Sequence, residues 1–379
     1  MRVDSPKTNR LETLPTEIFR IIINFLCPWD VKDLSRSSKR LREACLPSLF
    51  RRVKFQFSQA GFDGLKNLLK SDARNHIVSF TYVVPELLKA DLLDFDYFRS
   101  DILTPDSYVE TAKELYDAGD EADGCTPYMV IYETAHSICN EQRNIVDNST
   151  DLSVLSSTLG ALPRLTEVGL SFCETIDPDN AQLLSFASVM ISVEYSYEYH
   201  IRVISDALQS ARRSGVTILT ISLSGFDLPY YHTWEVPGLS TLSESLKKLL
   251  EFVQILRLTY SNSPLELLSH SALNLHQLDM CHVVSKYNAL EDFLGTNKST
   301  IRFIGFHDVE VTSSSQLGHL SKLTSGMLCE MLNVPQSTPC RAVDCGCLLF
   351  RKEGWRLLLN DIHVQPSAGT LTKSKFDKL

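Results

Sequence analysis

Three cysteines near the C-terminus are the clearest candidates for metal binding in this sequence. They are Cys340, Cys345 and Cys347 in the segment CRAVDCGC, and Cys329 or His363 could supply a fourth ligand. Structural zinc sites are usually built from paired knuckles, in which two ligands are separated by two to four residues. Here one gap is four residues, the other is a single residue, and no second knuckle follows. We therefore predict ordinary thiols at these positions, with no metal site and no cofactor.

Two other patterns could serve catalysis or cation binding. His307 and Asp308 are adjacent and could form a base with its orienting acid. No nucleophile elbow, catalytic-cysteine context or phosphate loop accompanies them, so we expect His307 to be a histidine at a strand edge, satisfied by its neighbours. The acidic run DLLDFDYFRSD lacks the spacing of a calcium loop. It indicates a solvated acidic face, or a dock for basic segments of another protein, and we predict that the chain is not an enzyme.

Composition and charge set the class of protein. The chain has 379 residues, of which 44% are hydrophobic and 22% charged, as in globular proteins with one or two domains. The N-terminus lacks the apolar core of a secretory signal, and the apolar stretch at residues 18–26 contains Arg20 and Asn24 and is too short to span a bilayer. We therefore expect a cytoplasmic or nuclear protein with reduced cysteines and no membrane partner.

Charge is distributed unevenly along the chain. Residues 86–123 hold twelve acidic and three basic side chains, which gives a net charge of −9, the same as that of the whole chain. The segment from Met1 to Arg74 holds fifteen Lys and Arg against eight Asp and Glu. A basic front end could bind nucleic acid or an acidic protein. The motif described next favours a protein, and no nucleic-acid partner is expected.

Residues 14–50 have the spacing of three short helices. Pro15 suits the first helical position and Glu17 the first turn, and Ile18, Ile22 and Leu26 form an apolar stripe. Pro28 must end this first helix, Asp30 can cap the second, and Val31, Leu34 and Leu41 continue the apolar face to Leu49 and Phe50. A unit this short is below the roughly 40 residues that fold alone, so it must be completed by the rest of the chain or by another protein.

This segment resembles an F-box. The shared features are Leu14-Pro15-x-Glu17-Ile18, the spaced aliphatics, the SSKRLRE step and the closing Leu49-Phe50, although Leu41 and Phe50 stand where Trp is commoner. The resemblance implies binding of the Skp adaptor, which links F-box proteins to a cullin–RING ubiquitin ligase, the SCF complex. The adaptor-binding residues it implies are Leu14, Pro15, Ile18, Ile22, Leu26, Leu34, Leu41, Leu49 and Phe50.

After Phe50 the pattern changes to recurring strands. The alternating VKFQF (residues 53–57) and IVSFTYVV (from Ile77) are followed by variants of L-x-x-L-x-L that begin at Leu165, Val216, Val253, Leu275 and Ile301. The last two of these spacings lie in the range of leucine-rich repeats. Helical periods lie between the strands, as in residues 201–215, STLSESLKKLLEF and ALEDFLGT. We expect an α/β fold with an irregular leucine-rich-repeat-like solenoid, although the first two spacings are longer and also suit an ordinary α/β domain.

The expected organisation is therefore an F-box at 11–52, first solenoid strands at 53–85, an acidic, partly helical insertion at 86–150, the solenoid at 151–364 and a mobile tail at 365–379. Helices are expected at residues 128–146 and 151–159. Residues 348–364 could supply a last strand or a capping helix, with Trp355 filling the open end of the solenoid. The central region is also similar to that of F-box proteins of filamentous fungi.

We expect a substrate-recognition subunit of an SCF-type ligase that performs no chemistry itself. A target protein would bind the open strand face, for which the candidate residues are Glu167, Thr220, Arg257, Gln277 and Arg302. Two alternatives remain. The chain could be an F-box protein that acts as an adaptor-bound scaffold outside the ligase, or a hydrolase-like enzyme with an accidental F-box resemblance.

Overall fold

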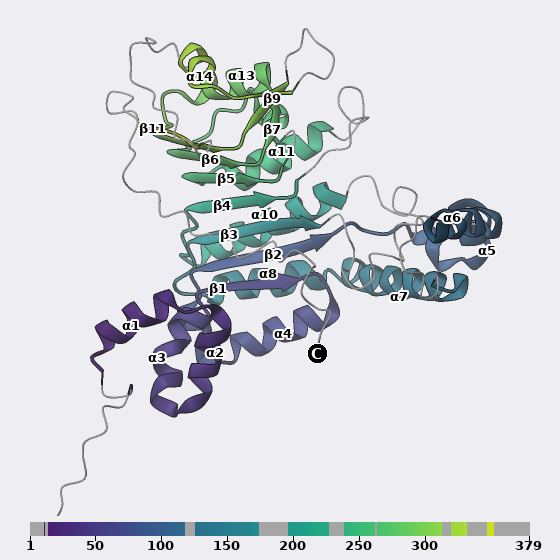
Figure 1. Ribbon diagram of the computed structural model, residues 1–379, viewed down its shortest axis with the longest axis horizontal. Helices are drawn as coiled ribbons and strands as arrows, with labels where there is room; N and C mark the ends of the chain where they lie inside the picture. The colour runs from purple at the N-terminus through teal and green to yellow at the C-terminus, as the bar shows by residue number, and fades with distance from the viewer. Residues whose placement is uncertain are drawn as a thin grey trace, which may run out of the picture.

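The protein is a mixed α/β structure. The computed structural model describes residue 11 and residues 14–117, 126–173, 196–226, 239–261, 264–312, 320–331 and 347–351 (Figure 1). Cys340, Cys345, Trp355, His363 and the expected tail lie outside these ranges. None of the helices in the described ranges combines the length and the apolar character needed to cross a membrane.

Within the described residues, eight strands form the main sheet in an order that follows the chain. The order is β1 (Arg52–Gln56), β2 (Ser79–Pro85), β3 (Glu167–Cys173), β4 (Thr220–Ser224), β5 (Ile255–Thr259), β6 (Gln277–Cys281), β8 (Phe303–His307) and β11 (Cys347–Arg351). Neighbours from β1 to β8 pair in parallel, whereas β11 pairs with β8 antiparallel. A small second sheet joins β7 (Val284–Lys286), β9 (Glu310–Thr312) and β10 (Leu320–Lys322). The expected strand at the C-terminal end is thus present as β11.

Helices cover one face of the main sheet (Figure 1). They are α4 (Gln59–Leu69), α8 (Thr150–Ala161), α10 (Ser196–Arg213), α11 (Leu239–Leu250), α12 (Pro264–Leu268), α13 (Tyr287–Asn297) and α14 (Ser325–Met331), with the turn η2 (Asp72–His76) beside α4. Successive side chains of a strand point to opposite faces. The row Phe80, Val168, Ile221, Leu256 and Leu278 is completely buried in the common core with the helices. We call the opposite face, with the row Gly169, Ser222, Arg257 and Asp279, the outer face.

The strands β4, β5, β6 and β8 end in the same backbone turn. Gly225, Tyr260, His282 and Asp308 each follow the last residue of a strand, and their φ angles are 70°, 49°, 52° and 51°. The amide N–H of His282, for example, donates to the carbonyl of His307 on the next strand at 2.9 Å. A left-handed residue is costly for side chains other than Gly and is more frequent for Asn, Asp and His. Its recurrence shows that these strand units share a local geometry.

The described residues 86–117 and 126–147 form a helical unit at the side of the sheet (Figure 1). Its elements are η3 (Ala90–Leu93), α5 (Phe95–Tyr97), η4 (Phe98–Ile102), α6 (Pro105–Asp117) and α7 (Tyr128–Asp147). Leu92, Phe98 and Ile131 belong to a small core of its own. The amide of Gln142 on α7 holds the residues that directly follow β2, because its oxygen accepts from the Leu88 N–H at 2.8 Å and its nitrogen donates to the Glu86 carbonyl at 3.0 Å. The helices expected at residues 128–146 and 151–159 are confirmed as α7 and α8.

The chain begins with three short helices, as expected: α1 (Thr16–Phe25), α2 (Pro28–Ser37) and α3 (Lys39–Leu49). Phe19, Ile23, Val31, Leu41 and Cys45 form a core that is separate from that of the sheet. The cap of α2 differs from expectation, because the Cys27 sulfur accepts from the Asp30 N–H at 3.4 Å and Asp30 lies in the first turn. These helices adjoin the β1 end of the sheet, where α3 contacts η2 (Figure 1).

The turn after β4 gives a test of this architecture. A Cβ atom on Gly225 would overlap the backbone oxygen of Phe172 and would also be strained by the positive φ, whereas Gly215, with a φ of 89°, has open space around it. We expect Gly225→Ala to lower the free energy of unfolding by about 3 kcal/mol and Gly215→Ala by about 1 kcal/mol. Gly64→Ala, in the open middle of α4, should raise it by about 0.5 kcal/mol. Urea denaturation of the three variants measures this order, and equal effects of Gly225→Ala and Gly215→Ala would contradict the close strand packing.

Candidate protein-binding surfaces

The first two helices expose an apolar surface that the rest of the described chain does not cover. Ile18, Ile21, Phe25 and Trp29 have exposed fractions of 46%, 54%, 85% and 71%. We call these four side chains the α1–α2 surface. On α1, residues spaced by three, four or seven positions share one side of the helix, so Phe19 and Ile23 point into the small core while Ile18, Ile21 and Phe25 point outward. Large apolar side chains exposed in this number over two adjacent helices are typical of interaction sites.

The residues expected to bind an adaptor fall into three groups. Pro15 and Ile18 are exposed, and Leu41 is buried in the small core. The others are half-buried: Leu14, Ile22, Leu26, Leu34, Leu49 and Phe50. Leu41 is therefore a core residue of the three helices rather than a surface contact in this conformation. Phe25 and Trp29 are the most exposed apolar side chains here, and the signal for Phe25 was its place two helical turns after Ile18.

The outer face carries a polar network that joins four adjacent strands, β3 to β6. Glu167 Oε1 accepts hydrogen bonds from Arg257 Nη1 at 3.1 Å and from Ser222 Oγ at 3.2 Å. Arg257 Nε reaches Asp279 Oδ2 at 3.4 Å, and Gln277 Nε2 donates to both oxygens of Asp279 at 3.1 and 2.8 Å. All five side chains are half-buried, so the network forms a fixed polar surface across the strands.

Asp279 is the electrostatically costly member of this network. Burial raises the pKa of its carboxyl group above the ordinary value, and the hydrogen bonds from Gln277 and the charge of Arg257 only partly oppose this shift. Arg257 lies between two carboxylates, those of Glu167 and Asp279. A guanidinium group can serve both because its five donors form a planar fork. Arg257 therefore holds the network together.

Only some of the residues expected on the substrate face belong to the polar network of the outer face. Glu167, Arg257 and Gln277 belong to the network, and Asp279 is a member that sequence reasoning missed. Thr220, which pairs with Glu167, is 7% exposed and buried. Arg302 is exposed but comes one residue before β8, where Phe303 is the partner of Gln277. The apolar side chain of Phe303, one residue after Arg302, therefore occupies the outer-face position of this strand.

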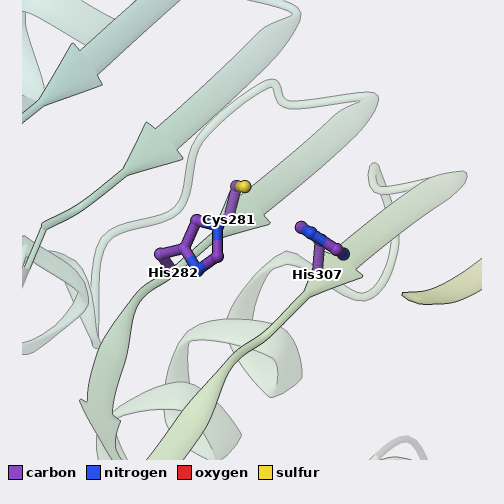
Figure 2. A group of neighbouring side chains, drawn as sticks. All are labelled: Cys281, His282 and His307. Atoms are coloured by element: carbon purple, nitrogen blue, oxygen red, sulfur yellow. The ribbon is translucent and has the colours of Figure 1, made fainter. Parts of the chain in front are cut away.

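A third group of side chains lies where β6 and β8 end (Figure 2). Cys281, His282 and His307 each place a potential ligand atom within 4.8 Å of the others, and we call them the strand-end cluster. Asp308 Oδ2 lies 3.0 Å from His282 Nδ1, and Lys322 Nζ donates to Asp308 Oδ1 at 3.1 Å. The Lys322 bond and then the His282 bond lower the pKa of Asp308. Asp308, which follows His307 in the sequence, thus pairs with His282, the residue after β6.

The acidic run of the helical side unit has the exposed character expected of it. Asp91, Asp94, Asp96 and Asp101 are all exposed, and Asp94 caps α5 by accepting from the Asp96 N–H at 2.8 Å.

No protein-family model matches the chain, and no curated protein matches it. The candidate sites are thus the α1–α2 surface, the outer-face network and the strand-end cluster.

Removing the guanidinium group of Arg257 tests whether this residue stabilises the polar network. We expect Arg257→Met to lower the free energy of unfolding at pH 7 by about 1–2 kcal/mol, because two half-buried carboxylates lose a donor. The raised pKa of Asp279 means that the folded chain takes up its proton at a higher pH than the unfolded chain, and loss of Arg257 raises this pKa further. A protonated Asp279 needs no cation, so the penalty should shrink as the pH falls.

Urea denaturation of the wild type and Arg257→Met from pH 7 to pH 5 measures this dependence. The matched control is Arg302→Met, which removes an exposed arginine outside the network and should change stability by less than about 0.5 kcal/mol. A penalty for Arg257→Met that stayed constant over this range would contradict the assigned role of Asp279.

Proposed function

We propose that this protein is a substrate-recognition subunit of an SCF-type cullin–RING ubiquitin ligase. The three N-terminal helices bind the Skp adaptor as an F-box, and the outer face of the sheet binds a target protein. The observation that carries the proposal is the α1–α2 surface, which exposes four large apolar side chains on the segment with the F-box pattern. Binding by the adaptor would remove these side chains from water.

The chemistry of the α1–α2 surface suits a stable protein interface. Burial of a large apolar side chain contributes about 1.5–3 kcal/mol, and aromatic anchors dominate the energetics of many interfaces. Phe25 and Trp29 supply such anchors, and Lys32 Nζ lies 4.8 Å from the centre of the Trp29 ring. Exposed side chains of both charges surround these apolar side chains, such as Arg20 and Lys32 beside Glu17 and Asp30, and they give the surface a polar rim. A protein adaptor with an apolar centre and a polar rim fits both properties.

The remainder of the chain acts as an irregular leucine-rich-repeat-like solenoid in this proposal. Three observations support it: the parallel strands follow the order of the chain, the covering helices contact one another in sequence from α8 to α14, and the left-handed turn recurs after β4, β5, β6 and β8. Repeat units of this kind contact mainly their neighbours and present one continuous face. The outer face, with its polar network, is that binding face.

The protein performs no chemical step in this function. Its contribution is to hold a target near the ubiquitin-charged enzyme, which raises the effective concentration of the target's lysines. The same geometry also suits a scaffold that binds the adaptor without a cullin. Recovery of adaptor and cullin together distinguishes the two.

Substitution in the LPTE segment tests adaptor binding. Leu14→Ala with Pro15→Ala should weaken binding of purified Skp adaptor by about ten- to a thousand-fold, because apolar contacts worth about 1.4–4 kcal/mol are lost. Biolayer interferometry with immobilised adaptor measures the change. Phe252→Ala is the matched control, because Phe252 is also an exposed aromatic residue but lies after α11. Wild-type affinity in the double variant would contradict the assignment of the LPTE segment to the adaptor contact.

Affinity purification under proteasome inhibition tests the whole proposal. The complete chain should recover adaptor, cullin and target proteins, whereas a chain lacking residues 11–52 should recover the targets alone. This separation is expected because the core of the three helices is distinct from that of the sheet. Recovery of adaptor without cullin would support the scaffold, and failure to recover adaptor at all would refute both functions.

A further inference from the structure

We propose that the strand-end cluster is a zinc-binding site, with the Cys281 thiolate and the imidazoles of His282 and His307 as its protein ligands. This site is independent of adaptor binding and goes beyond the proposed function. The three side chains come from the carboxyl ends of β6 and β8 and gather on the outer face of the sheet (Figure 2). Cysteine and histidine are the preferred ligands of Zn²⁺ in proteins.

The parallel register brings two of the ligands together. Cys281 and His307 are direct partners on β6 and β8, and neighbouring strands lie about 4.8 Å apart. Both are the last residues of their strands and lie on the outer face, because their neighbours Met280 and Phe306 are buried in the core. Register alone therefore places a thiol beside an imidazole.

The turn after β6 supplies the third ligand. His282 follows Cys281 directly, and in an extended strand its side chain would point to the opposite face. Its φ of 52° places it in the left-handed region instead, and its ring lies with Cys281 and His307 (Figure 2). All three residues are half-buried, so an ion can reach them from solvent.

The distances are close to those of a metal centre. The three ligand atoms lie within 4.8 Å of one another, whereas ligand atoms around a tetrahedral zinc ion are roughly 3.3–3.6 Å apart, given Zn–N bonds of about 2.0–2.1 Å and a Zn–S bond of about 2.3 Å. Closing this difference needs a movement of about 1 Å, which small side-chain rotations provide.

Residues around the cluster hold His282 as metal-binding histidines are usually held. His282 Nδ1 faces Asp308 Oδ2 at 3.0 Å, which leaves Nε2 as the ligand atom. A carboxylate behind a ligating histidine fixes its tautomer and raises its basicity. Lys322 holds the other oxygen of Asp308 at 3.1 Å. The ring of Tyr260 stacks on His282 with centroids 4.9 Å apart and planes inclined by 8°.

The ligand set favours zinc over harder cations. Calcium and magnesium prefer oxygen ligands, whereas two imidazoles and a thiolate suit zinc. Three protein ligands leave a fourth position for water or for a donor atom of a bound protein. Cys281 and His282 are adjacent, so no residues separate them as in a zinc knuckle, and His307 lies on a different strand, β8. The spacing rules used for the C-terminal cysteines therefore do not detect this site.

Titration of the metal-free full chain with Co²⁺, used as a spectroscopic substitute for zinc, tests the proposal. We expect one equivalent to bind with a thiolate-to-cobalt charge-transfer band and the visible absorption of a tetrahedral ion, and zinc should displace it. Cys281→Ser should abolish the thiolate band, and His307→Asn should weaken zinc binding at least about tenfold. Asp308→Asn should retain the band but weaken zinc binding by about ten- to a hundred-fold, as for other carboxylates that support a ligating histidine.

Cys27→Ser and His270→Asn are the matched controls, because both side chains are exposed and lie outside the cluster. They should leave the cobalt spectrum and the zinc affinity unchanged, and thermal unfolding of each variant verifies that it is folded. Absence of a thiolate band in the wild-type protein would overturn the proposal whatever the variants do. A band that survives in Cys281→Ser would also overturn it, because the metal would then be bound by other cysteines.

Discussion

The in-register pairing of parallel strands is the constraint on which the rest of the structure depends. Each strand from β1 to β8 aligns one apolar row with the helices and one mixed row with solvent. A shift of one residue would exchange the two faces, so the buried rows fix the outer face as strictly as the core. Polar side chains from four strands therefore meet around Arg257, although Glu167 and Asp279 are far apart in the sequence.

The three N-terminal helices follow a different principle. Their core consists of a few side chains around Phe19, Val31 and Leu41, and α1 directs large apolar side chains outward as well as inward. An autonomous helix of this length would be marginal in water. The unit gains support from α3 against η2, which leaves α1 and α2 available for another protein. In the proposed function, the exposed side chains of Phe25 and Trp29 are contacts that the partner would cover.

Local patterns predicted the elements well, and long-range pairing determined what they could not predict. Period-two alternation gave the strand around residues 53–57, and helical spacing gave α7 and the first three helices. Arg302 was misassigned because the position of an outer-face residue depends on which residue pairs with Gln277, and this is Phe303. The cluster of Cys281, His282 and His307 was missed because its ligands belong to different strand units. Only the register shows that they are neighbours.

The sheet also sets the distance between the three N-terminal helices and the strand-end cluster. The three helices adjoin the β1 end (Figure 1), and the strand-end cluster lies on β6 and β8. With about 4.8 Å between neighbouring strands, the six steps from β1 to β8 in the sheet order span roughly 29 Å. A continuously hydrogen-bonded sheet resists bending much more than a flexible linker of that length. A target on the outer face would thus be held at a nearly fixed distance from the adaptor, and a fixed distance concentrates its lysines in a small volume. In the proposed function, this rigidity is the means by which the protein would raise the rate of transfer.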